Sequence, residues 1–129
     1  MANNGKAPTE KKRFFSSFKY AARGMRLAFL KGRNIRIFVI IAVIALLAGY
    51  FLKISTIEWL FLIFTIGVTF GSELFNTALE VLGDKITLKK DAQIAVVKDI
   101  AAAAVLTLSV MSVAVGLVIF LPRIIQLFQ

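Results

Sequence analysis

Long runs of apolar residues, almost free of charge, are the feature that most constrains how this chain can fold. Residues 100–121 form the cleanest run, with 22 uncharged residues before Pro122, and a helix of that length crosses about 30 Å of hydrocarbon. A second run covers residues 37–52, and a third begins at Trp59 and contains two glutamates. Because 59% of the 129 residues are hydrophobic, which is more than a soluble domain uses, the excess must face lipid. The sequence therefore predicts an all-α integral membrane protein, formed by a single domain over residues 1–129.

Three transmembrane helices are expected from these runs, over residues 35–52, 57–82 and 96–121. The link between the first two is short and leaves room only for a tight hairpin turn. Ten of the 16 basic residues precede the first span, and four more lie in the second loop, residues 83–99. Cytoplasmic segments of membrane proteins carry such an excess of Lys and Arg, so we expect a cytoplasmic N-terminus and a C-terminus outside.

A further helix is expected over residues 13–31, which are too polar to span a membrane but have helical spacing. One face would carry the apolar residues and another the basic ones: Phe14, Phe15, Phe18, Ala22, Met25 and Phe29, against Lys19, Arg23 and Arg26. This pattern is typical of an amphipathic helix on an anionic bilayer surface. Two interpretations stay open: the charges only set the topology, or some of them also bind phosphates. Since the topology already accounts for the net charge of +9, we expect no nucleic-acid partner.

The chain has no cysteine and no histidine, which excludes disulfides, zinc sites, haem ligation and Cys- or His-based catalysis. It also has neither the GxxxxGKS/T loop nor the GxGxxG loop of soluble nucleotide-binding folds. Carboxylates, Lys, Arg, hydroxyl groups and Asn remain for any chemistry. A nucleotide would therefore be bound through carboxylates that hold magnesium and through cations that hold phosphate oxygens.

Four polar residues share one stripe of the middle predicted span: Glu73, Asn76, Glu80 and Asp84. Glu73 would lie about 16 Å deeper along the helix than Asp84, at about 1.5 Å of rise per residue. A carboxylate at such a depth costs at least about 2.5–3.5 kcal/mol, so it is expected to face a polar cavity or a partner. Such a carboxylate can serve as a general base.

Another interpretation is that these polar side chains only join neighbouring helices by hydrogen bonds. Small residues that favour close helix packing accompany them, at Gly67 and Gly71 in the same span and at Ser112 and Gly116 in the next. Two carboxylates and an amide exceed what helix association requires, so we favour a working site.

Three stretches carry a resemblance to a known family: Glu73-Leu-Phe-Asn-Thr-Ala-Leu-Glu80 followed by Asp84, Lys98-Asp99 before an alanine-rich helix, and Phe18-Lys-Tyr-Ala-Ala-Arg-Gly-Met-Arg26. The first resembles the signature E-L-x-N-S/T-A-I/L-E…D of the small prokaryotic lipid kinases, the diacylglycerol kinase and undecaprenol kinase family. The resemblance covers about residues 13–123. Residues 33–36 and 116–124 look most like the undecaprenol kinases of Gram-positive bacteria.

This resemblance implies a homotrimer of three-helix protomers, each with an amphipathic surface helix, and composite active sites between subunits. It implies that Glu73 is the catalytic carboxylate, which takes the proton from the lipid hydroxyl, and that Glu80 binds magnesium on the phosphates of ATP. Asn76 would lie beside the transferring phosphate, and Lys98 would contact phosphates. The other nucleotide-binding positions implied by the resemblance are Arg13, Tyr20 and Asp99.

One position departs from the family pattern. After the surface helix the family usually carries a glutamate that joins Glu80 on the metal, and the aligned residue here is Gly32, flanked by Lys31 and Arg33. Three explanations stay open: the metal site works with fewer protein ligands, a nearby carboxylate replaces the missing one, or the activity is weakened. Because magnesium often takes only one or two carboxylates together with phosphates, the enzyme remains the preferred hypothesis.

The resemblance leads us to expect ATP-dependent phosphorylation of a membrane lipid alcohol, by a multi-pass enzyme of the bacterial inner (plasma) membrane. Undecaprenol is the preferred substrate, and diacylglycerol is the alternative. Two hypotheses of other classes stay open. One is an oligomeric channel or transporter that uses Glu73 and Glu80 as a relay, and the other is a degenerate kinase, disabled at Gly32, that only binds lipid or nucleotide.

Overall fold

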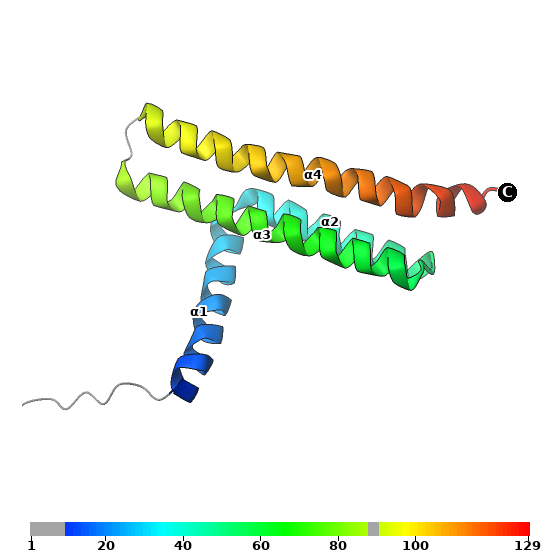
Figure 1. The fold of residues 1–129 in the computed structure, drawn as a ribbon, viewed down its shortest axis with the longest axis horizontal. Helices are drawn as coiled ribbons and strands as arrows, with labels where there is room; N and C mark the ends of the chain where they lie inside the picture. The colour runs from blue at the N-terminus through cyan, green and yellow to red at the C-terminus, as the bar shows by residue number, and fades with distance from the viewer. Residues whose placement is uncertain (1–9, 88–90) are drawn as a thin grey trace, which may run out of the picture.

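The computed structural model describes residues 10–87 and 91–129, and these residues form four helices (Figure 1). The helices are α1 (Glu10–Lys31), α2 (Arg33–Phe51), α3 (Thr56–Ile86) and α4 (Ala92–Gln126). By length and composition α2, α3 and α4 can each cross a membrane. The prediction of an all-helical membrane protein with three spans is therefore confirmed.

Side chains at the N-caps fix where α3 and α4 begin. Ser55 and Glu58 form a capping box, in which Ser55 Oγ accepts from the Glu58 N–H at 3.3 Å and Glu58 Oε2 accepts from the Ser55 N–H at 2.6 Å. Asp91 Oδ1 accepts from the backbone N–H groups of the second and third residues of α4. Between α2 and α3, Lys53 has a left-handed φ of 50°, and the chain reverses there in a tight turn.

Helices α3 and α4 are longer than a membrane crossing requires, which is about 20 residues. They have 31 and 35 residues. Helix α3 continues past residue 82, the expected end of the second span, and α4 continues past residue 121 with Pro122 inside it. Helices in membranes accommodate a proline by local adjustment of the backbone, which explains why Pro122 does not end α4. The end of α3 and the start of α4 lie well beyond the point where α1 joins the bundle (Figure 1).

Helix α3 contacts both α2 and α4, and it lies beside α4 along most of its length (Figure 1). Ile54, Leu62 and Ile119 form a small buried cluster near the α2–α3 turn. Further along, the hydroxyl groups of Thr69 and Ser112 are 2.7 Å apart and link α3 to α4. Most other apolar side chains of the three helices are exposed in the single chain, which is the surface expected for contact with lipid or with other copies.

The face of α3 that packs on α4 is not the face predicted from its small residues. A Cβ at Gly83 would lie 2.9 Å from Lys98 Cε, so α4 passes close to α3 at that glycine. By contrast, no heavy atom of the described neighbours lies within 4 Å of a Cβ placed at Gly67 or Gly71. The prediction of close packing there is wrong within one chain, because Thr69 and Gly83, which face α4, lie on the opposite side of the helix.

Helix α1 runs crosswise to the other three helices (Figure 1), and Gly32 is the single residue between α1 and α2. Gly32 is the N-cap of α2 and has extended backbone angles, φ −86° and ψ 112°. Its N–H donates to the carbonyl of Ala28 at 2.7 Å, which closes the last turn of α1. This break turns the chain from α1 into α2 and brings the junction against α3.

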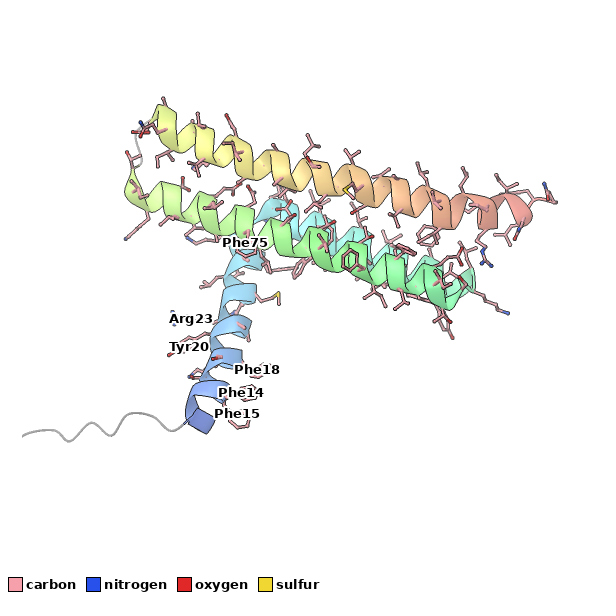
Figure 2. The ribbon with its side chains drawn as sticks, in the orientation of Figure 1. Phe14, Phe15, Phe18, Tyr20, Arg23 and Phe75 are labelled. Carbon is pink, nitrogen blue, oxygen red and sulfur yellow. The ribbon has the colours of Figure 1, made fainter. Side chains whose placement is uncertain are left out.

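The labelled side chains of α1 lie on two sides of the helix (Figure 2). Figure 2 shows Phe14, Phe15 and Phe18 on one side of α1 and Tyr20 and Arg23 on the other. The ring centroids of Phe14 and Phe18 are 5.1 Å apart, so the aromatic side chains also contact one another. These three phenylalanines thus lie on the other side of α1 from Tyr20 and Arg23.

Candidate active site

A polar cavity of about 360 Å³ lies in the corner between the α1–α2 junction and α3. Its lining residues are Lys31, Gly32, Arg33 and Asn34 from the junction and Glu73, Asn76, Thr77 and Glu80 from α3. The α3 residues share one face of the helix because they are three or four positions apart. The structure therefore brings Glu73, Asn76 and Glu80, three of the residues predicted for the site, to one cavity.

Glu73 and Asn76 are buried, and each has an oxygen atom without a partner. Both side chains are about 5% exposed, and Glu73 Oε2 and Asn76 Oδ1 have no hydrogen-bond partner among the described residues. The amide nitrogen of Asn76 donates to Glu80 Oε1 at 2.9 Å, whereas Glu80 itself is exposed. A buried acceptor without a donor is unfavourable by about 1–3 kcal/mol, so these oxygens are expected to bind a group supplied from outside the chain.

These buried side chains do not join α3 to another helix. In the described part of the chain, Asn76 is bonded within its own helix, and no hydrogen bond joins Glu73 to α2 or α4. The polar link between helices is instead made by Thr69 and Ser112. This favours a working site over the alternative in which Glu73 and Asn76 only associate helices.

Gly32 lies in the junction, close to both α1 and α3. A Cβ at this position would be 2.9 Å from the carbonyl oxygen of Ala28 and 3.3 Å from Thr77 Oγ1. A side chain therefore does not fit at residue 32 without movement of the backbone. Instead of the glutamate that the family resemblance places here, the chain has a glycine that lies close to both Ala28 of α1 and Thr77 of α3.

Lys98 lies near the cavity but not in it. Its ammonium group donates to Asp84 Oδ1 at 2.5 Å. Asp84 follows Glu80 by one helical turn, which is about 6 Å along the axis of α3. The predicted stripe on α3 therefore continues from the cavity to an ion pair with α4.

Two other residues predicted to bind nucleotide, Tyr20 and Asp99, lie away from this cavity in the single chain. Asp99 is exposed and follows Lys98 directly, so it is on a different face of α4. Tyr20 is 67% exposed on α1, with Lys19, Arg23 and Arg26 around it. Arg13 belongs to α1, but its side chain lies outside the part of the chain that the structure describes.

Four residues of the cavity were not predicted for the site: Lys31, Arg33, Asn34 and Thr77. Thr77 is four residues after Glu73, so the helical spacing that places Glu73, Asn76 and Glu80 on one face of α3 also places Thr77 there. The three junction residues flank the glycine at which the family pattern is interrupted. Their approach to α3 depends on how the chain turns at Gly32, and no local pattern in the sequence specifies that turn.

A second, larger cavity adjoins the polar one. It has a volume of about 840 Å³, lies between α1 and the last turns of α3, and is lined almost entirely by apolar atoms. Lys31 and Thr77 line both cavities. The polar cavity thus lies next to an apolar groove that can accommodate a hydrocarbon chain.

The oxygen atoms of the polar cavity fit a magnesium ion that is also bound by phosphates. Among the residues that the structure describes, no three acidic side chains come together to hold a metal ion by themselves. Magnesium usually takes one or two carboxylates, together with waters and phosphate oxygens. The Glu80 carboxylate and the unpartnered Asn76 Oδ1 are oxygen ligands of this kind. They would hold the magnesium ion once a polyphosphate is present.

Three membrane-length helices, with a buried carboxylate site beside an apolar groove, define an integral membrane enzyme that works at a lipid surface. Known proteins support this class. The family model of prokaryotic diacylglycerol kinase matches residues 19–120. Undecaprenol kinase of Bacillus subtilis (strain 168) is 39% identical over 115 residues, which cover 89% of this chain and 94% of that protein. Diacylglycerol kinase of Synechocystis sp. is 35% identical over 112 residues, or 86% of this chain and 64% of that protein.

The chain belongs to the prokaryotic diacylglycerol kinase family, and it is a lipid kinase. The resemblance seen in the sequence is therefore confirmed. Membership of an enzyme family also favours the kinase over the channel or transporter hypothesis.

Proposed function

We propose that this lipid kinase transfers the γ-phosphate of ATP to undecaprenol at the cytoplasmic face of a bacterial plasma membrane. The observation that carries the proposal is the cavity in which Glu73, Asn76 and Glu80 meet. This substrate is supported by the similarity to undecaprenol kinase, because the matched residues cover 94% of that relative. Diacylglycerol is the second candidate, because the other relative is a diacylglycerol kinase.

Glu73 is proposed as the general base. As the lipid oxygen attacks the γ-phosphorus, the hydroxyl proton passes to the Glu73 carboxylate, and the bond between the γ-phosphorus and the leaving ADP oxygen breaks. The unpartnered Glu73 Oε2 supports this role, because it can accept a hydrogen bond from an incoming hydroxyl. Glu73 precedes Glu80 by about 10 Å along the helix axis, so the lipid would arrive from the bilayer side and ATP from the cytoplasmic side.

Glu80, Asn76 and Lys98 are proposed to act on the phosphates. Glu80 and Asn76 would hold magnesium, which supplies positive charge that offsets the charge of the phosphate groups. Asp84 orients the Lys98 ammonium group one turn beyond Glu80, and from there its flexible side chain can reach a phosphate oxygen. Phosphoryl transfer depends mainly on positioning and electrostatic stabilisation, and these are the contributions that such residues make.

A homotrimer with composite sites is proposed for the complete enzyme. Tyr20 and Asp99 are exposed and lie outside the cavity of their own chain. If they and Arg13 bind nucleotide, as the resemblance implies, a neighbouring copy must bring them to the site. The many exposed apolar side chains along α2, α3 and α4 leave surface for such contacts.

We further propose that α1 lies on the cytoplasmic surface of the membrane as an amphipathic helix. Its crosswise direction relative to the spans, and the separation of phenylalanines from Tyr20 and Arg23, support this position (Figures 1 and 2). The N-terminus and the α3–α4 connection would then be cytoplasmic and the C-terminus outside, in agreement with the distribution of Lys and Arg.

Transfer of labelled γ-phosphate from MgATP to undecaprenol and, separately, to diacylglycerol tests the proposed substrate. Purified protein in mixed micelles should show the higher kcat/KM with undecaprenol. A higher value with diacylglycerol would assign the second candidate. Absence of transfer to both lipids would overturn the proposal.

A further inference from the structure

Two cations of the polar cavity have no partner among the residues that the structure describes. Lys31 and Arg33 line the cavity together with the carboxylates of Glu73 and Glu80. Even so, neither cation forms a salt bridge, and neither side chain forms a hydrogen bond, within the described residues. Both side chains belong to exposed residues and are free to turn toward a ligand in the cavity.

The N-terminus of α2 opens into the same cavity. Its N-cap is Gly32, which has no side chain to accept from the first backbone N–H groups, and its first turn contains no acidic residue. Gly32, Arg33 and Asn34 all line the cavity. A helix N-terminus has a partial positive charge and attracts anions, phosphate in particular.

The charges of the cavity indicate what kind of ligand fits. Lys31 and Arg33 carry two positive charges, and Glu73 and Glu80 carry two negative charges when ionised, so the cavity alone is close to neutral. Phosphate groups brought beside two carboxylates would be repelled unless cations lie between or around them. The uncapped N-terminus of α2, with Lys31 before it and Arg33 in its first turn, provides that positive charge.

We propose that Lys31, Arg33 and the N-terminus of α2 form a phosphate-binding site on the opposite wall of the cavity from Glu73 and Glu80. This inference rests on the proposed phosphoryl transfer and names residues that bind the transferred group. At this position the site would contact the phosphate end of the nucleotide before transfer. It would also stabilise the negative charge that the phosphoryl group carries during transfer.

The two cations differ in what else they touch. Lys31 also lines the apolar groove, whereas Arg33 lines only the polar cavity. A phosphate bound by Lys31 therefore lies where the two cavities meet and can come from either source, the nucleotide or the phosphorylated lipid. Arg33 is placed for the nucleotide alone.

Binding measurements on the full chain in mixed micelles test this site, with the β,γ-imido analogue of ATP plus magnesium in one arm and undecaprenyl phosphate in the other. Lys31→Met and Arg33→Met are compared with a control, Arg36→Met. Arg36 is also a cation near the N-terminus of α2, but it lines neither cavity. Loss of one charge-assisted hydrogen bond should weaken binding of the ATP analogue about tenfold in each of the first two variants. Lys31→Met should also weaken binding of the lipid phosphate, Arg33→Met should not, and Lys31→Arg should restore most of the affinity.

The outcomes separate this inference from the proposed function. Affinities of Lys31→Met and Arg33→Met equal to that of Arg36→Met would overturn the phosphate site, even if the enzyme transfers phosphate normally. Conversely, specific losses of affinity would support the site even if the wild-type chain phosphorylated neither lipid. A loss of lipid-phosphate binding in Arg33→Met as large as in Lys31→Met would refute the division of roles between the two cations.

Discussion

Adding a side chain at Gly32 tests how closely this residue packs against the end of α1 and against α3. A Cβ there would lie 2.9 Å from the Ala28 carbonyl oxygen and 3.3 Å from Thr77 Oγ1. The first atom belongs to the backbone and cannot rotate away, so the end of α1 must move. Because Gly32 has a φ of −86°, which any residue adopts, the substitution introduces steric overlap without backbone strain.

The expected magnitude follows from two opposing effects. Overpacking a close contact costs about 1–3 kcal/mol. Replacing glycine by alanine also restricts the unfolded chain, which stabilises the fold by about 0.4–1 kcal/mol. We therefore expect Gly32→Ala to lower the free energy of unfolding by about 1–2 kcal/mol. Titration with SDS in mixed micelles, followed by helix content, measures this difference against the wild type.

Gly32→Glu has the same Cβ and adds the carboxylate that the family pattern places there, so Gly32→Ala is its matched control. We expect turnover of Gly32→Glu to stay at or below that of the wild type across a magnesium series. The reason is that a third carboxylate beside Glu73 and Glu80 adds to the repulsion of phosphate. The γ-phosphate transfer assay provides the rates.

Two results would refute this reasoning. Unchanged stability of Gly32→Ala would show that the end of α1 moves without cost. Turnover of Gly32→Glu several-fold above that of both Gly32→Ala and the wild type would show that the missing carboxylate limits the reaction, as the degenerate-kinase hypothesis expects.

The remaining predictions concern polar contacts between α3 and α4. A double-mutant cycle of Thr69→Val and Ser112→Ala should give a coupling free energy of about 0.6 kcal/mol, with an upper bound of about 1.7 kcal/mol, because their hydroxyl groups are bonded across the interface. A coupling of zero in SDS titrations would contradict that bond. Asp84→Asn should change stability by less than about 1 kcal/mol, yet raise the KM for MgATP because Lys98 loses the carboxylate that positions it. An unchanged KM would contradict the positioning role.

The three spans could be predicted because a membrane crossing is encoded locally, in the length of an apolar run. The same holds for the α3 side of the cavity. Glu73, Asn76 and Glu80 meet because helical periodicity alone places them on one face. Both predictions relied on a single helix, although α3 and α4 continue past their predicted ends at residues 82 and 121.

The other side of the cavity could not be predicted, because it depends on contacts between distant segments. Lys31 and Arg33 enter the cavity only because the chain turns at Gly32 and packs against α3. Likewise Arg123, in the last turn of α4, donates to Glu58 Oε2 in the first turn of α3 at 2.9 Å. Each of these contacts joins residues whose proximity is set by tertiary packing rather than by spacing along one helix.

Replacement of Glu73 by glutamine tests the central claim most directly, because it keeps the size of the side chain and removes the base. Glu58→Gln, in the first turn of α3 and outside the cavity, is the control for loss of a carboxylate from the same helix. The account predicts that Glu73→Gln lowers the rate of γ-phosphate transfer by about 10²–10⁴-fold, while the affinity for MgATP stays close to that of the wild type. Transfer at the wild-type rate in Glu73→Gln would contradict the account and remove Glu73 as the base.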